Sequence, residues 1–211
     1  VSWFMGTLCE NIARRANKED DCKGHFWESR YQCRECSDAG ALLICGIYVD
    51  LNAIRAGEAS SPETSVYTSI YSRLQAKKRR KNARNREDGW LAELTLRPEC
   101  KEDEQWAYKS RTGRRASDLG VLPISLDSYL QLLKWTAQEL QSGKRQTIPK
   151  HLESILEHME IDHEQWLDTI ADYQRAFCHV VGSPKSLNEA AGRMDAQFLK
   201  GATASRRAYL K

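Results

Sequence analysis

The sequence predicts an α+β protein that is mostly helical and contains one short strand. Aromatic and polar residues alternate from Phe26 to Tyr31, and a period of two indicates a strand. Residues 41–54 are apolar on nearly every side, which is typical of a buried helix. Residues 123–211 repeat apolar side chains at helical spacing, which predicts an all-α C-terminal region.

The N-terminal elements follow from apolar spacing and from capping residues. Residues 2–18 form the first expected helix, whose apolar stripe predicts a core-facing side; the stripe consists of Trp3, Phe4, Leu8 and Ile12. Ser37 or Asp38 offers a side-chain oxygen to cap the buried helix. Another helix is expected from about Ser65, after a turn at Pro62.

The C-terminal helices are bounded by residues that start or stop helices. Asp127 caps the first of them and Gly143 ends it. Pro149 opens the second, residues 163–181 form a longer one, and Ser183 with Pro184 starts a short one. A last helix is expected to carry Phe198 and Tyr209. We interpret the aromatic stripes as core and assign this region no chemistry.

Composition and charge predict three parts and a reducing compartment. We expect domain boundaries that give residues 1–76, a basic and charged connector over 77–122, and a helical region over 123–211. The net charge is +3, and the basic excess lies within residues 1–86. Seven cysteines and no apolar run long enough to span a bilayer favour a cytoplasmic protein with reduced thiols and no membrane partner. The chain begins at Val1, so we expect a fragment.

The segment from Gly24 to Gly57 carries a resemblance to a known family. Its features are Gly-His-Phe-Trp-Glu-Ser-Arg-Tyr, the apolar helix, and Tyr-Val-Asp-Leu-Asn-Ala-Ile-Arg-Ala. It resembles the C-terminal half of the single-tyrosine HUH transposases, in particular the REP-associated ones. The resemblance implies a truncated ferredoxin-like catalytic domain. It also implies that Tyr48 is the nucleophile, attacking single-stranded or hairpin DNA to form a 5′-phosphotyrosine, and that Asn52 is a ligand of Mg²⁺ or Mn²⁺.

The family's other metal ligands are absent from this chain. None of the five histidines belongs to a His-x-His pair, and the first of them, His25, stands at the start of the expected strand. Position 53 is Ala where the family commonly has Pro. We therefore expect no DNA cleavage by this polypeptide alone. The alternative for Tyr48 is a buried tyrosine whose hydroxyl is hydrogen-bonded.

Basic and aromatic residues are the candidates for DNA contact. Seven Lys and Arg side chains crowd into residues 77–86, a density that favours a polyanion or a solvated linker. Arg14 and Arg15 close the first expected helix, where they either face DNA or complement the helix dipole. The full set of candidates is Arg14, Arg15, Trp27, Arg30, Lys77, Lys78, Arg79, Arg80 and Lys81.

Four soft ligands form a second, weaker pattern. Cys22, His25, Cys33 and Cys36 match the number of ligands of a structural zinc site. His25 and Cys33 fall at opposite ends of the expected strand, whereas zinc ligand pairs usually lie on tight turns, so we do not expect zinc. Three functions stay open: a truncated transposase, which we favour, a non-catalytic nucleic-acid-binding remnant, and a zinc-stabilised interaction module. The sequence gives no oligomeric state.

Overall fold

The computed structural model describes residues 1–78, 91–96, 120–143 and 146–210. The chain divides into two compact units, Val1–Arg34 and Glu35–Lys211, and each is described by itself. The first unit contains α1 (Ser2–Glu19). The elements of the second unit are, in chain order, β1 (Glu35–Cys36), α2 (Ala39–Asp50), α3 (Asn52–Arg55), η1 (Pro62–Thr64), α4 (Ser69–Lys78), α5 (Leu126–Ser142), α6 (Lys150–His158), α7 (Trp166–Ala176), β2 (Val180–Val181), α8 (Pro184–Arg193) and α9 (Ala202–Ala208).

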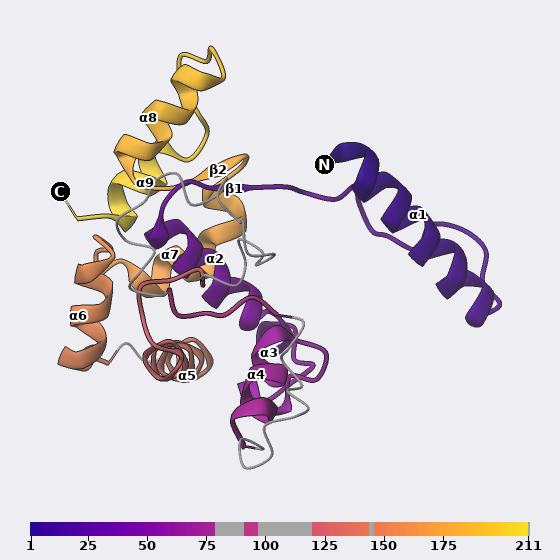
Figure 1. Ribbon diagram of the computed structural model, residues 1–211, viewed down its shortest axis with the longest axis horizontal. Coiled ribbons are helices and arrows are strands. Elements are labelled where there is room, and N and C mark those ends of the chain that lie inside the picture. Colours follow the sequence, from indigo (N-terminus) through magenta and orange to yellow (C-terminus); the bar gives the residue numbers. More distant parts are fainter. Residues whose placement is uncertain (79–90, 97–119, 144–145, 211) are drawn as a thin grey trace, which may run out of the picture. The chain divides into compact units, whose positions relative to one another are not determined.

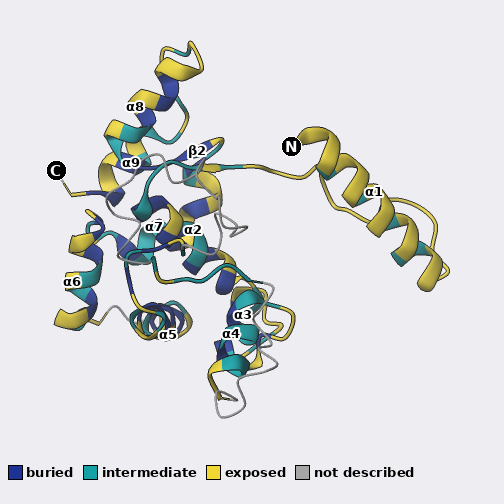
Figure 2. Cartoon of the chain, viewed as in Figure 1, coloured by how far each residue is buried: buried dark blue, intermediate teal, exposed yellow. Residues whose placement is uncertain are grey.

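Helix α1 has an apolar stripe that stays exposed. Trp3, Phe4, Leu8 and Ile12 are all exposed, Trp3 by 82%, so the expected core-facing side is wrong for this structure (Figure 2). The physical reason is that a unit with one helix and one loop offers too little surface to close a core. Helical periodicity identifies the apolar face of a helix, but it does not show that another element covers that face.

The strand expected over Phe26–Tyr31 is also absent, because those residues form a bend. The rings of Phe26 and Trp27 meet edge to face with centroids 4.8 Å apart. The indole nitrogen of Trp27 donates to the carbonyl oxygen of Cys9 at 2.9 Å, which ties this loop to α1. The aromatic residues are thus used to dock a loop on a helix rather than to line a sheet.

Helix α2 lies at the centre of the second unit, as expected for its apolar sequence. Asp38 caps it, since its carboxylate accepts a hydrogen bond from the backbone N–H of Ala41 at 2.7 Å. The helix packs against α7 and lies in the middle of this unit (Figure 1). Two glycines allow close approach: a Cβ at Gly40 would lie 2.9 Å from the Tyr209 ring, and one at Gly46 would lie 3.1 Å from the Tyr129 hydroxyl.

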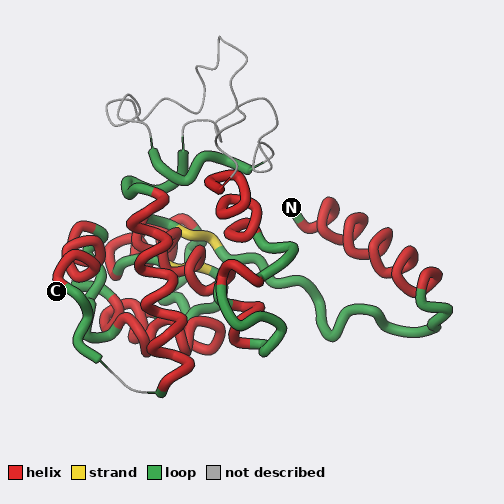
Figure 3. Tube along the Cα trace, turned by 90° about the horizontal axis from the view of Figure 1, so that it is seen from below, coloured by secondary structure: helices red, strands yellow, loops and turns green. Residues whose placement is uncertain are grey.

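A two-stranded parallel sheet joins the start of this unit to its C-terminal part (Figure 3). Glu35 pairs with Val180, and Cys36 pairs with Val181. The backbone N–H of Ser37 donates to the carbonyl of Val181 at 2.9 Å and extends the ladder by one bond. The α+β class is therefore correct, although the strand is not the one that alternation predicts.

The C-terminal helices agree with the expected boundaries at several points. Gly143 ends α5 in the left-handed conformation, Pro149 precedes α6, and Ser183 caps α8 with Pro184 at its first position.

Other helix boundaries differ from those expected. The cap of α5 is Ser125 rather than Asp127, and α4 begins at Ser69 rather than Ser65. The expected helix over 163–181 is shorter, because its end becomes β2. Helix α9 contains neither Phe198 nor Tyr209.

The two regions expected as separate domains share one core. Apolar side chains of α2, α3 and α4 lie in the same buried cluster as those of α5, α6 and α7. The division falls after Arg34 instead of near residue 76, because α2 packs against the C-terminal helices as well as against α3 and α4. Among the described helices, none has the length and apolarity needed to cross a bilayer.

Candidate functional site

Tyr48 lies in the core, near the end of α2. Its side chain is 8% exposed, and its ring is tilted against that of Tyr173 on α7 with centroids 4.5 Å apart. The guanidinium carbon of Arg55 lies 4.8 Å from the centroid of the Tyr48 ring. Arg55 also donates to the carbonyl of Ala171 at 3.1 Å, which fixes the guanidinium between α3 and α7. The ring therefore lies between a cation and a second aromatic ring.

Asn52 is four residues further on and belongs to the next helix. Helix α2 ends at Asp50, and Leu51 serves as its C-cap and as the N-cap of α3. Leu51 has helical dihedral angles, so the chain continues in nearly the same direction. Asn52 is exposed, whereas Tyr48 is buried. The helical spacing is that expected from the sequence, but the structure does not expose the two side chains together.

Asp50 connects the end of α2 to two other helices. Its carboxylate accepts hydrogen bonds from the Tyr129 hydroxyl on α5 at 2.6 Å and from the Ser69 hydroxyl on α4 at 2.9 Å. Burial raises the pKa of Asp50, and the two hydrogen bonds oppose that rise. Burial and the neighbouring carboxylate raise the pKa of Tyr129 well above its ordinary value. Sequence analysis missed this network because its three residues are far apart in the chain.

The raised pKa of Asp50 predicts how Asp50→Asn responds to pH. Because the folded pKa exceeds the ordinary value of 3.8, the folded state holds the proton more tightly than the unfolded state. The contribution of Asp50 to stability is thus greatest below pH 3.8 and falls as pH rises through the folded pKa. Urea unfolding should show that the free energy of unfolding of wild type exceeds that of Asp50→Asn by an amount that decreases as pH rises from 3.8 through the folded pKa. A gap that widens with pH would mean that the folded pKa is depressed.

The expected metal ligands are not brought together. Within the part of the chain that the structure describes, the one group of three His, Cys, Asp or Glu side chains with ligand atoms within 4.8 Å of one another is Glu153, Glu157 and His163. It lies on α6 and the following loop, not at Asn52. The Nε2 atom of His163 is 3.4 Å from the Glu153 carboxylate, which makes an ion pair if His163 is protonated. This group could not be predicted from the sequence, because it forms only when the loop after α6 brings His163 back to the helix.

The residues of the possible zinc pattern are divided between the two units. Cys22 and Cys33 are exposed free thiols in the first unit, together with the exposed His25. Cys36 belongs to the second unit, where a hydrogen bond with the Cys45 thiol and burial raise its pKa. The described residues thus pair Cys36 with Cys45 on α2 instead of with Cys33.

The candidate DNA-binding residues are mostly exposed and partly paired. Arg14 forms an ion pair with Glu10 at 2.5 Å, and Arg15 pairs with Glu19 at 2.9 Å, each across one turn of α1. Exposed pairs of this kind contribute little to stability and leave both arginines accessible. Arg30 is exposed, and so is Trp27 despite its hydrogen bond.

The basic run is described only at its start. Lys77 forms an ion pair with Asp127 on α5, and Lys78 is exposed at the end of α4. Arg79, Arg80 and Lys81 lie outside the described residues. Asp127 does not cap α5 because the helix begins one residue earlier, at Leu126, with Ser125 as its cap; the Asp127 carboxylate contacts α4 instead.

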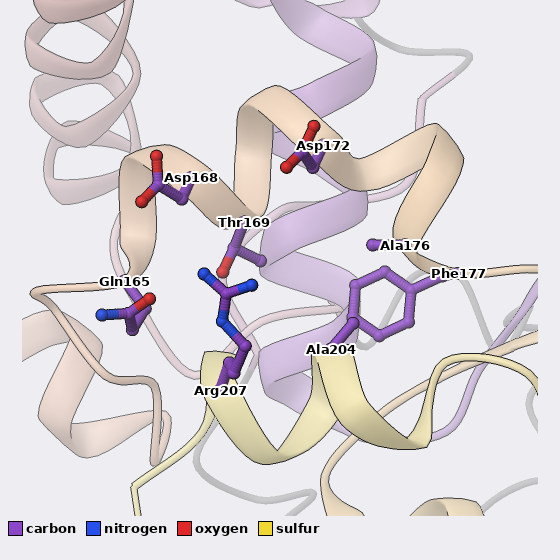
Figure 4. Close-up of a pocket in the computed structure, with 8 residues that line it drawn as sticks. All are labelled: Gln165, Asp168, Thr169, Asp172, Ala176, Phe177, Ala204 and Arg207. Atoms are coloured by element: carbon purple, nitrogen blue, oxygen red, sulfur yellow. The ribbon is translucent and has the colours of Figure 1, made fainter.

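A cleft between α7 and α9 is lined by several charged side chains. Figure 4 shows Arg207 extending from α9 toward Thr169 of α7, with Asp168 and Asp172 on the α7 side. A larger cavity of about 530 Å³ adjoins it and is lined by Arg175, Lys200 and Arg207 among others. Sequence analysis assigned this region no chemistry.

Comparison with known proteins does not identify the chain. No family model matches it, no curated protein matches it, and no solved structure matches it. The residues themselves therefore carry the functional argument.

Proposed function

We propose that this chain derives from the part of a single-tyrosine HUH transposase that carries the nucleophilic helix. In this proposal it binds single-stranded or hairpin DNA and does not cleave it without a separate source of the HUH histidines. The ferredoxin-like fold of that family is taken as the ancestor of residues 1–76. The observation that carries the proposal is the pair of consecutive helices α2 and α3, which carry Tyr48 near the end of the first and Asn52 at the start of the second.

The lack of cleavage follows from the surroundings of Tyr48. A tyrosine hydroxyl with an ordinary pKa near 10 is a poor nucleophile at neutral pH, so it needs a cation that stabilises the developing charge. In the described residues no group of three His, Cys or carboxylate side chains gathers at Asn52, so the donors present do not fit Mg²⁺ or Mn²⁺. Tyr173 also covers one face of the Tyr48 ring.

We expect the purified chain to form no covalent DNA adduct. Incubation of hairpin DNA with the protein and Mn²⁺ should leave the substrate intact on a denaturing gel. Wild type and Tyr48→Phe should then give identical results. A 5′-phosphotyrosine adduct that forms with wild type and is absent from Tyr48→Phe would overturn the proposed inactivity and identify the nucleophile.

DNA binding should depend on the basic run. We expect labelled single-stranded DNA to bind with an affinity that falls with salt, because each phosphate contact contributes about 0.7 to the slope of log K against log salt. Changing Lys77, Lys78, Arg79, Arg80 and Lys81 to Gln should lower that slope measurably in fluorescence anisotropy. The proposal fails if wild type does not bind the DNA at all.

A further inference from the structure

We infer that the cleft between α7 and α9 is a second binding surface for single-stranded nucleic acid, which holds phosphates on its cations and one unpaired base on Phe198. The inference rests on the proposed function, since it adds a contact for the same class of ligand. The cleft comprises the cavity of about 530 Å³ lined by Asp172, Arg175, Phe198, Lys200, Ala204 and Arg207. Such a volume lies within the range of ligand pockets in proteins.

The charge of the cleft favours an anion. Arg175, Lys200 and Arg207 supply three cations to the cavity, whose one acidic lining residue is Asp172, and Asp168 lines the adjoining pocket of Figure 4. Among the described residues, the ion pairs found involve none of these three cations. Three cations against two carboxylates leave this hollow surface with a net positive charge, which attracts phosphate.

The cationic surface continues around α9. Arg206 and Arg207 line an adjoining cavity of about 570 Å³, whose one acidic lining residue is Asp162. In sequence, residues 196–211 contain Lys200, Arg206, Arg207 and Lys211 and no acidic residue. A stretch of one sign that borders two cavities provides contacts for several successive phosphates rather than for one small anion.

Phe198 points to a single strand rather than a duplex. It is 79% exposed and lies in the loop between α8 and α9, two residues before Lys200. An accessible aromatic ring beside phosphate-binding cations can stack on a base, which requires that the base be unpaired. The positions of Arg175, Arg206 and Arg207 have a simpler explanation, because they lie in the last turns of their helices, where a cation interacts favourably with the helix dipole. It explains neither Lys200 nor the exposed ring.

The test uses the full chain and a fluorescent fifteen-nucleotide oligothymidylate in anisotropy titrations at several salt concentrations. The triple variant Arg175→Gln, Lys200→Gln, Arg207→Gln should lower the slope of log K against log salt by about 2, from about 0.7 for each contact. Phe198→Ala should weaken binding about tenfold with the slope unchanged. Asp172→Asn should tighten binding, because it removes the opposing charge that lines the cavity itself.

A matched control removes the same charge from exposed lysines elsewhere. Lys18→Gln, Lys150→Gln, Lys185→Gln should leave the slope nearly unchanged, and circular dichroism should show that every variant is folded. If wild type binds and the cleft variant behaves like this control, the inference fails while the proposed function stands. If wild type does not bind, both fail. A cleft variant that loses binding to phosphatidylserine vesicles but not to the oligonucleotide also overturns the inference in favour of a lipid surface.

Discussion

Asp38→Ala is expected to lower the free energy of unfolding by about 4 kcal/mol, as the sum of a lost helix cap and three further lost hydrogen bonds. One carboxylate oxygen of Asp38 accepts from the backbone N–H of Ala41 and from the Tyr209 hydroxyl, at 2.7 and 3.0 Å. The other accepts from the backbone N–H of Ser183 and the hydroxyl of Ser186, at 2.7 and 2.9 Å. A single side chain thus joins the starts of α2 and α8 to the C-terminal Tyr209.

The comparison with Asp38→Ser separates the two roles of this residue. Serine keeps the capping oxygen for α2 but is too short to reach α8 and Tyr209. We therefore expect urea unfolding to place Asp38→Ser between wild type and Asp38→Ala, closer to the latter. Equal stability of Asp38→Ser and wild type would show that the long-range bonds contribute nothing.

Trp166→Ala should cost about 3–5 kcal/mol of unfolding free energy, the usual range for removing a large buried aromatic side chain. Trp166 is fully buried at the start of α7. Its indole nitrogen donates to the Thr136 hydroxyl at 2.9 Å, and that hydroxyl donates to the carbonyl of Leu132 at 2.7 Å. The variant would leave both a cavity and a hydroxyl on α5 without its donor.

Trp3→Ala is the matched control for that measurement. Trp3 is 82% exposed on α1, so its truncation should change the free energy of unfolding by no more than about 0.5 kcal/mol. Both variants can be measured by the same urea titration with circular dichroism. A similar effect for the two tryptophans would contradict the burial described for the second unit.

Helix ends were predicted correctly where they depend on the conformational preferences of a few neighbouring residues. Gly143 ends α5 because only a residue free of a Cβ adopts the left-handed cap easily, and Ser183 with Pro184 starts α8 for equally local reasons. The apolar segment from residue 41 was correctly expected to be a helix in the core, but it is not buried on every side, because Leu42 is 41% and Val49 is 55% exposed.

Features that depend on distant partners could not be predicted in this way. The β1–β2 sheet consists of two-residue strands with no alternation to detect, and its partners are separated by most of the chain. The environment of Tyr48 depends on Tyr173, and the sequence gives no reason to bring these two residues together. The apolar stripe of α1 shows that a clear helical period does not predict burial, because no element of the same unit covers the stripe.

The burial of α2 has a consequence for folding during protein synthesis. Its apolar sides are covered by α5 and α7, whose residues are synthesised later. At the usual rates of translation, roughly 6 to 26 s pass between the emergence of Asp50 and that of Phe177, about 130 residues later. Until α7 has emerged, the face of α2 that packs against it is exposed, and an exposed apolar helix face is a binding surface for a chaperone.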